Sequence, residues 1–274
     1  DAYETITYPV VFHLIQDKTK VELGQGVGAD IVNYAFNTIY NCFARTAAFS
    51  PNGADTKIRF RLAEYDPNGR KMEEKGINRY SLSTSDLNNL NPEKIKNNPK
   101  ICWDYKRYLN IWIVENMGNS VSTPHYILNT ADLNQIQGVS FEQLSLEEIE
   151  KQEYSLTDIG LIYGARDFAI EDVGYPTQMG KFFGLLDTEN QKEDYCEDTF
   201  AYNTYKEPWN TALEGSNSRL KISTDGLIFY SVNIMDASSY KNTISMDQVK
   251  RIRTITDNCP HRWAWKSDWA FTGK

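Results

Sequence analysis

The sequence lacks several features that would assign it to a common functional class. No uninterrupted apolar run approaches the roughly 18 residues that a membrane-spanning helix needs, so no transmembrane segment is predicted. Lys and Arg number 29 against 37 Asp and Glu, which gives a formal charge of -8. A general nucleic-acid-binding protein needs a basic face to displace counterions, so this charge argues against one. Histidine is also scarce, with three residues in 274.

The four cysteines are widely spaced, and no two of them form the CxxC pair of a zinc knuckle or a redox motif. They are Cys42, Cys102, Cys196 and Cys259. Three disulfide pairings remain open for them, and so does a set of four buried free thiols.

What is present is the composition of a packed globular protein, with 41% hydrophobic and 13% aromatic residues. We expect a single α/β (α+β) domain over residues 1–274. Strands and helices alternate in its upper part, to about residue 186, and irregular chain predominates in its lower part, from about residue 187.

Residues rich in β-branched and aromatic side chains predict four strands, over residues 5–16, 57–65, 107–115 and 158–163. The third of these is almost continuously apolar, so we expect it at the centre of the sheet. Residues 82–100 are rich in Asn, Ser and Pro and predict a loop with short helical turns.

Apolar residues at helical spacing predict amphipathic helices over residues 30–47, with Asp30 near the N-cap, and over residues 172–186. The acidic stretch 144–153 predicts a solvated helix or loop. Ser245 and Gln248 form a capping box that opens a last helix, which ends at Cys259.

The second half of the helix at 172–186 has a recognisable pattern. Residues 177–187 read TQMGKFFGLLD, an apolar helix followed by a glycine turn. This framework resembles the zinc-binding helix of metzincin proteases, whose signature is HExxHxxGxxH. In that signature the three His bind zinc, and the Glu accepts a proton from the zinc-bound water.

Other segments, in the same order along the chain, resemble the pappalysin (ulilysin-like) family of metzincins. They are residues 8–13 (YPVVFH), 60–69 (FRLAEYDPNG), 76–79 (GINR), 108–113 (YLNIWI) and 233–236 (NIMD). The last resembles the Met-turn, with Met235 as its methionine. The resemblance covers about residues 5–258. It implies a metzincin-like zincin fold with a twisted mixed sheet, a backing helix, an active-site helix and a C-terminal helix.

The chemical positions of the signature are all changed in this sequence. By the resemblance, Thr177, Lys181 and Asp187 stand at the three His positions and Gln178 at the Glu position. Thr is a poor zinc ligand, a protonated Lys cannot coordinate, and Gln cannot accept a proton at neutral pH. Zinc and the general base are therefore expected to be absent, so no catalytic residue is predicted.

Two of these changed residues carry opposite charges. We expect the ammonium of Lys181 to approach Asp187, with Gln178 or Thr177 hydrogen-bonded nearby, so that a fixed positive charge stands in for the metal. The alternative is that Lys181 extends into water. Gly184 and Met235 remain as the structural residues of the site.

The histidines and one acidic segment are the remaining candidate metal ligands. None of the three histidines, His13, His125 and His261, is predicted to rebuild a zinc site. Glu197 and Asp198 lie where pappalysins carry acidic residues near calcium, which makes them calcium candidates. A solvated acidic loop is the alternative.

The residues and the resemblance together predict a catalytically inactive pseudoprotease that keeps a cleft for a peptide or protein. One alternative is an active metallopeptidase with an atypical metal site. Another is a surface structural or carbohydrate-contact module, for which the tail at 263–269 (WAWKSDW) would supply tryptophans. The same tryptophans can instead cover the lower part of the core. The resemblance and the absence of a leader imply a secreted or cell-surface (periplasmic) protein, with a lipid anchor as a further option.

Overall fold

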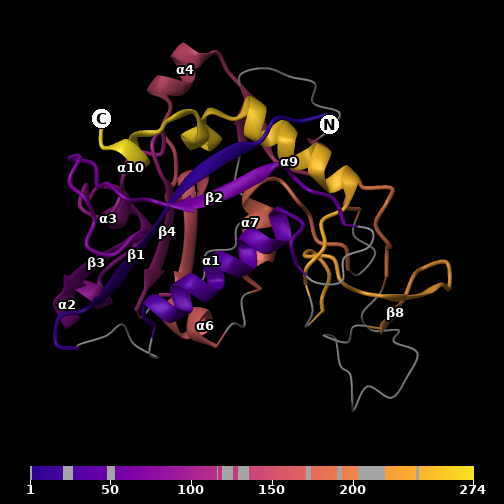
Figure 1. The fold of residues 1–274 in the computed structure, drawn as a ribbon, viewed down its shortest axis with the longest axis horizontal. Helices are drawn as coiled ribbons and strands as arrows, with labels where there is room; N and C mark the ends of the chain where they lie inside the picture. The colour runs from indigo at the N-terminus through magenta and orange to yellow at the C-terminus, as the bar shows by residue number, and fades with distance from the viewer. Residues whose placement is uncertain are drawn as a thin grey trace.

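Strand β1 (Ile6–Asp17) is the longest strand of the protein, and the sheet is built around it (Figure 1). All of its residues except Thr7 are buried, as its apolar, β-branched sequence predicts. The computed structural model describes residues 2–20, 27–47, 53–115, 117–118, 126–128, 136–170, 174–189, 193–202, 220–238 and 241–274, and structural statements below concern these residues.

Five strands form the main sheet, in the order β2 (Ile58–Leu62), β1, β4 (Leu109–Val114) and β7 (Gly160–Gly164), with β3 (Ile77–Leu82) also paired to β1. The first half of β1 pairs with β2 and the second half with β3. The four predicted strands are confirmed. β4 is buried throughout between β1 and β7, as a central strand should be.

Strand pairing differs from the mixed sheet that the resemblance implies. All four pairings among the described strands of the main sheet are parallel. Strands β5 (Tyr126–Leu128) and β6 (Phe141–Gln143) form a separate parallel pair. The antiparallel pairing within the described strands lies in a hairpin of β8 (Leu220–Ile222) and β9 (Ile228–Tyr230).

Three longer helices pack on one face of the sheet: α1 (Ala29–Phe43), α7 (Tyr175–Phe182) and α9 (Met246–Asn258). Figure 1 shows α1 and α7 side by side, and the two helices contact each other. The capping box at Ser245 is confirmed, because its hydroxyl accepts from the backbone N–H of Gln248 at 3.2 Å. Asp30 lies in the first turn of α1, two residues after the N-cap Gly28, which confirms that it is near the N-cap.

Most of the shorter helices connect two strands along the chain. They are α2 (Thr84–Asn88), α3 (Pro92–Lys96), α4 (Leu146–Lys151), α5 (Leu156–Ile159), α6 (Ala165–Ala169), the 3-10 turns η4 (Pro260–Arg262) and η5 (Ala264–Lys266), and α10 (Trp269–Thr272). The helical turns predicted within residues 82–100 correspond to α2 and α3. The helix expected in the acidic stretch is α4.

The C-terminal tail confirms one expectation for Trp265 and corrects it for Trp269. Trp265 packs against the main core cluster, which includes Met235 of the lower part, whereas Trp269 packs against a separate small cluster that contains Val11 of β1. Its indole N–H donates to the carbonyl of Asp66 at 3.1 Å. The chain returns to the sheet after α9, and spacing in the sequence gives no sign of this return.

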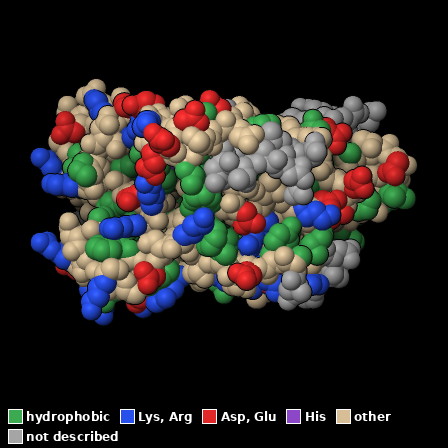
Figure 2. All heavy atoms as spheres, turned by 90° about the horizontal axis from the view of Figure 1, so that it is seen from above, with side chains coloured by type: hydrophobic (Ala, Val, Ile, Leu, Met, Phe, Trp, Pro, Cys, Tyr) green, Lys and Arg blue, Asp and Glu red, His purple; other side chains and the backbone are tan. Residues whose placement is uncertain are grey.

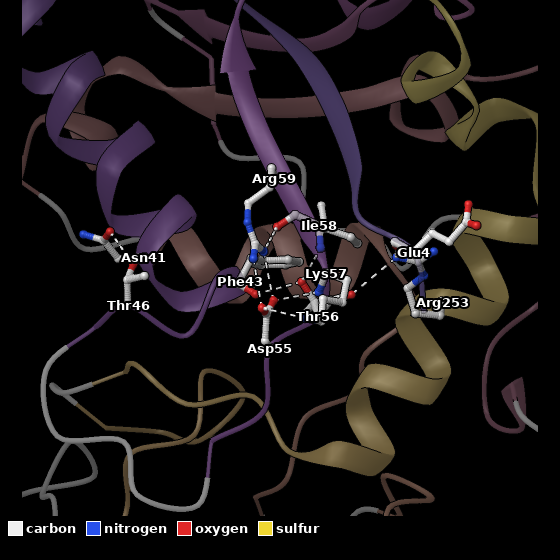
Figure 3. A network of polar contacts seen from close by, with 10 residues as sticks. All are labelled: Glu4, Asn41, Phe43, Thr46, Asp55, Thr56, Lys57, Ile58, Arg59 and Arg253. Carbon is white, nitrogen blue, oxygen red and sulfur yellow. Dashed lines mark hydrogen bonds and ion pairs between the residues drawn. The ribbon is translucent and has the colours of Figure 1, made fainter. Parts of the chain in front are cut away.

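A polar network joins α1, β2 and α9 at the N-terminal ends of β1 and β2 (Figure 3). The two terminal nitrogens of Arg59, Nη1 and Nη2, donate to the carboxylate of Asp55 at 2.8 and 2.9 Å. The Thr56 hydroxyl donates to the carbonyl of Phe43, at the end of α1, and Arg253 of α9 donates to the carbonyl of Glu4. These bonds fix the start of β1 and β2 against the two helices.

The four cysteines are free thiols in the structure, which leaves none of the three disulfide pairings. Burial raises the pKa of Cys42 and Cys196 to about 12, so both are neutral at physiological pH. Within the described part of the chain, no helix has the length and apolar character to cross a membrane. On the face shown in Figure 2, basic and acidic side chains are interspersed.

Candidate functional site

Helix α7 carries Thr177, Gln178 and Lys181, which the resemblance places at signature positions, and a glycine turn follows it. Gly184 adopts a φ of +92°, in the left-handed region that favours glycine. A Cβ at this position would lie 2.9 Å from Cγ1 of Ile255 in α9, so the turn also has no room for a side chain. This glycine turn sends the chain away from the helix axis and places Asp187 beyond its end.

Two buried arginines hold the last carbonyls of this helix and turn. Arg262 donates from Nε to the carbonyl of Phe182 at 3.0 Å, and Arg251 donates from Nη2 to the carbonyl of Gly184 at 2.9 Å. The final carbonyls of a helix have no partner within the helix and carry partial negative charge, which a cation stabilises. The far C-terminal part of the chain therefore fixes the end of α7.

The segment that resembles the Met-turn (residues 233–236), called the Met-turn below, lies directly against α7. Met235 is 2% exposed, and a Cβ added to Gly180 would lie 3.0 Å from its sulfur. Ile234 would be 3.1 Å from the same point through Cδ1. The hydroxyl of Thr177 donates to the carbonyl of Ile234 at 2.5 Å. Gly180 thus allows the close approach of helix and turn.

The ion pair predicted at the site is present. Nζ of Lys181 lies 3.1 Å from Oδ1 of Asp187, with the two side chains 22% and 30% exposed. Lys181 therefore pairs across the glycine turn, and the alternative in which it extends alone into water is not observed. Gln178 is half-buried on the same helix.

A second lysine, not identified from the sequence, belongs to the same site. Nζ of Lys241 donates to the hydroxyl of Thr177 at 3.0 Å. Burial lowers the pKa of Lys241, and the nearby charge of Lys181 lowers it further, while Asp236 and Asp187 oppose the shift. Thr177 is therefore bonded to Lys241 and the Met-turn, where a bond near Lys181 was expected.

Asp236 extends the site beyond the Met-turn. Its carboxylate accepts from the hydroxyl of Thr188 at 2.5 Å and from that of Ser231 at 2.7 Å. Burial raises its pKa, although these two hydrogen bonds favour the ionised form. Because Thr188 directly follows Asp187, this bond ties the ion pair to the Met-turn.

Comparison with solved structures finds the same arrangement of the chain in a protease from Tannerella forsythia. Mature mirolysin in complex with a cleaved peptide matches with a TM-score of 0.59 and 20% identity, over 98% of this chain and 97% of that chain. A promirolysin mutant from the same organism gives 0.57 and 20%, over 97% and 85%. Mirolysin in complex with compound 9 gives 0.60 and 18%, over 98% and 99%.

This chain has the mirolysin fold. Mirolysin is a pappalysin- and ulilysin-like metzincin, so the fold class that the resemblance implies is confirmed. Models of protein families and curated proteins give no match. At this level of identity the likeness establishes the fold alone.

The two histidines that the structure describes, His13 and His261, are both buried. His13 is buried in the sheet, where it bonds to Asn110 at 2.7 Å and to Asn78 at 2.9 Å. Burial lowers its pKa to about 4. His261 is buried against the rings of Tyr105 and Tyr154, and His125 lies outside the described residues. The described ranges contain no group of three or more His, Cys, Asp or Glu placed to hold a metal.

The calcium candidates have a structural role at the start of α9. The carboxylate of Asp198 accepts from the Ser245 hydroxyl at 2.6 Å and from the backbone N–H of Asp247 at 2.9 Å. The backbone N–H of Glu197 donates to the Asp247 carboxylate at 3.1 Å. Asp198 therefore satisfies part of the N-terminus of α9.

Proposed function

We propose that this protein is a catalytically inactive relative of mirolysin that binds a peptide without cleaving it. The observation that carries the proposal is the pairing of Lys181 with Asp187, together with the bond from Lys241 to Thr177. These contacts engage the three positions at which the metzincin signature places zinc ligands.

The charges at these positions oppose metal binding. A zinc ion between the signature positions would meet the ammonium groups of Lys181 and Lys241, and two like charges at such range repel strongly where water is partly excluded. Burial is the main cause that lowers the pKa of Lys241, and the charge of Lys181 adds to it. Gln178, at the Glu position, cannot serve as a general base.

Peptide recognition does not require the metal. An extended peptide can be held through main-chain hydrogen bonds along a strand and through pockets for alternate side chains. Mirolysin has been solved with a cleaved peptide, and we propose that the shared fold retains such a binding mode. In this reading, the ammonium of Lys181 replaces zinc as the partner of a peptide oxygen.

The first experiment separates inactivity from an atypical metallopeptidase. Metal content, chelator sensitivity and cleavage of a general protein substrate are measured on the purified chain. We expect less than stoichiometric zinc and intact substrate. Stoichiometric zinc with cleavage that a chelator abolishes would overturn the proposal and favour the atypical metallopeptidase.

The second experiment tests peptide binding with a charge-matched pair of variants. A peptide library is screened against the wild type, and the affinity of each binding peptide is measured for Lys181→Glu and Lys250→Glu. Lys250 is exposed on α9 and pairs with Asp247, so its reversal controls for overall charge. We expect only Lys181→Glu to weaken binding. No binding by the wild type would favour a structural surface module.

The third experiment tests the assignment of the signature positions. Replacing Thr177, Lys181 and Asp187 together by His should create a zinc site, measurable by calorimetry, if the three positions are degenerate ligand positions. A folded triple variant without zinc affinity would contradict the assignment. We also propose that the protein is secreted or at the cell surface, which fractionation of the source cells tests.

A further inference from the structure

A pocket of about 300 Å³ lies between α4 and the chain that follows α9. It shares no lining residue with the site on α7. Leu146 and Ile149 of α4 line it together with Pro260 and Trp263. Lys106 and Lys266 add two ammonium groups. The volume is at the lower end of the roughly 300–1,000 Å³ range of ligand pockets, which suits a single ring.

Trp263 differs from the other described tryptophans in its hydrogen bonding. Four of them donate the indole N–H to a backbone carbonyl: Trp103 to Lys100, Trp112 to Ile101, Trp265 to Thr256 and Trp269 to Asp66, at 2.7–3.2 Å. The indole N–H of Trp263 is buried and has no acceptor. A buried donor without an acceptor is costly, and native proteins rarely leave one unless something else satisfies it.

A second polar group without a partner lies beside the same pocket. Both ring nitrogens of His261 are buried and make no hydrogen bond. Its ring packs edge-on against that of Tyr105, which lines the pocket, with centroids 5.0 Å apart. Burial lowers the pKa of His261 to about 4, so it is neutral at pH 7. Trp263 in the lining and His261 behind Tyr105 thus both have buried polar atoms without a hydrogen-bond partner.

The charges at the pocket favour an anion. The ammonium of Lys266 lies 3.4 Å from the ring centroid of Trp263, and the Lys266 side chain is exposed, so it can move aside for a ligand. Lys106 pairs with Glu150 at 2.7 Å, which neutralises the one carboxylate in the lining. The remaining charge is the ammonium of Lys266.

We propose that this pocket binds a carboxylate attached to a small apolar ring. The ring occupies the space between Leu146, Ile149 and Pro260. A carboxylate oxygen accepts the hydrogen bond from the Trp263 indole, and Lys266 supplies the counter-charge. Either a free aromatic acid or a peptide that ends in an aromatic residue carries this chemistry. The proposal does not depend on the proposed function.

The test follows the indole N–H resonances of 15N-labelled protein during titration with phenylacetate. We expect a saturable shift of the Trp263 resonance, while those of Trp103, Trp112 and Trp265 stay in place. Phenylacetamide and acetate, which lack the charge and the ring respectively, should each bind at least about tenfold more weakly. Absence of saturation at millimolar phenylacetate would overturn the proposal.

Variants separate the roles of the two key groups. Trp263→Phe keeps a ring and removes the donor, and it should weaken phenylacetate binding about tenfold. Trp265→Phe, whose indole already donates to Thr256, should leave the affinity unchanged. Equal affinity of the Trp263→Phe variant and the wild type would refute the role of the indole.

A third variant protects the test against misfolding of Trp263→Phe. Leu146 is 50% exposed at the first position of α4, where Glu is well tolerated, so Leu146→Glu should fold and repel the carboxylate. Unchanged affinity in this variant would place phenylacetate elsewhere. A peptide ending in Phe, compared with its amidated form, identifies the source: binding of the free acid alone supports a peptide terminus. If phenylacetate binds and neither peptide does, the natural ligand is a small aromatic acid.

Discussion

The ion pair at the end of α7 allows a quantitative test of how the site is held together. Replacing Lys181 by Gln, Asp187 by Asn, and both together gives a double-mutant cycle whose coupling free energy isolates the pair. At 3.1 Å the gross attraction is ~1.3 kcal/mol in water and ~5 kcal/mol at an effective dielectric constant of ~20. Desolvation and side-chain entropy offset most of it, and we expect a net coupling of about 1 kcal/mol.

Chemical denaturation of the four proteins measures the coupling, and a second cycle supplies the control. Lys151 and Glu147 form an ion pair of similar length, 2.8 Å, but their side chains are 72% and 82% exposed. Water screens such a pair, so its coupling should be about 0.3–0.5 kcal/mol. If the two cycles gave the same value, the partial burial of Lys181 and Asp187 would have no energetic consequence, and the reasoning would fail.

Three further predictions concern stability. Gly184→Ala should destabilise the fold by at least about 1–2 kcal/mol in thermal unfolding, because the left-handed φ is costly for alanine and its Cβ would press on Ile255. Gly226→Ala is the control, because Gly226 has the same φ but open space around it, so its loss of stability measures the backbone strain without the contact. In the folded protein, burial lowers the pKa of His13 to about 4 from its usual ~6.5. The stability that neutral His13 confers is therefore complete above pH ~6.5, and as the pH falls toward 4 the free energy of unfolding drops by roughly 3 kcal/mol. Urea unfolding should show a weaker pH dependence in His13→Gln, and an identical dependence would contradict the assignment of this pH dependence to His13. Asp198→Ala should lower the free energy of unfolding by about 1 kcal/mol with or without calcium, because the residue caps α9. If calcium raised the melting temperature of the wild type and this variant abolished the rise, a calcium site would be supported instead.

Local pattern accounts for the elements that were predicted correctly. Buried parallel strands such as β1 and β4 are continuously apolar, and the capping box at Ser245 marks the start of α9 by its own chemistry. β3 was missed because only one of its six residues is buried, and a polar strand at the edge of a sheet leaves no apolar run to detect. The ends of helices were less well predicted, because α1 ends at Phe43 and α7 spans only Tyr175–Phe182.

The candidate site divides in the same way. The approach of Lys181 to Asp187 was predicted because the resemblance places both at zinc-ligand positions, which converge in the metzincin signature. Lys241 could not be predicted, because no motif contains it and only packing of the Met-turn segment against α7 brings its ammonium to Thr177. Arg251 and Arg262 were missed for the same reason: a buried arginine is recognisable only when the carbonyls that it satisfies are known.

The sequence by itself determined the apolar helix and glycine turn at residues 177–187, and the resemblance to the metzincin signature led to the proposal that Thr, Gln, Lys and Asp replace His and Glu there. It also determined four strands of the main sheet, because burial on both faces requires continuous apolar strands, but it did not determine that they pair in parallel. Only the tertiary structure decided that two lysines converge on these positions and that Trp263 keeps an indole N–H without an acceptor. Both depend on contacts between residues far apart in the chain, which no local pattern encodes.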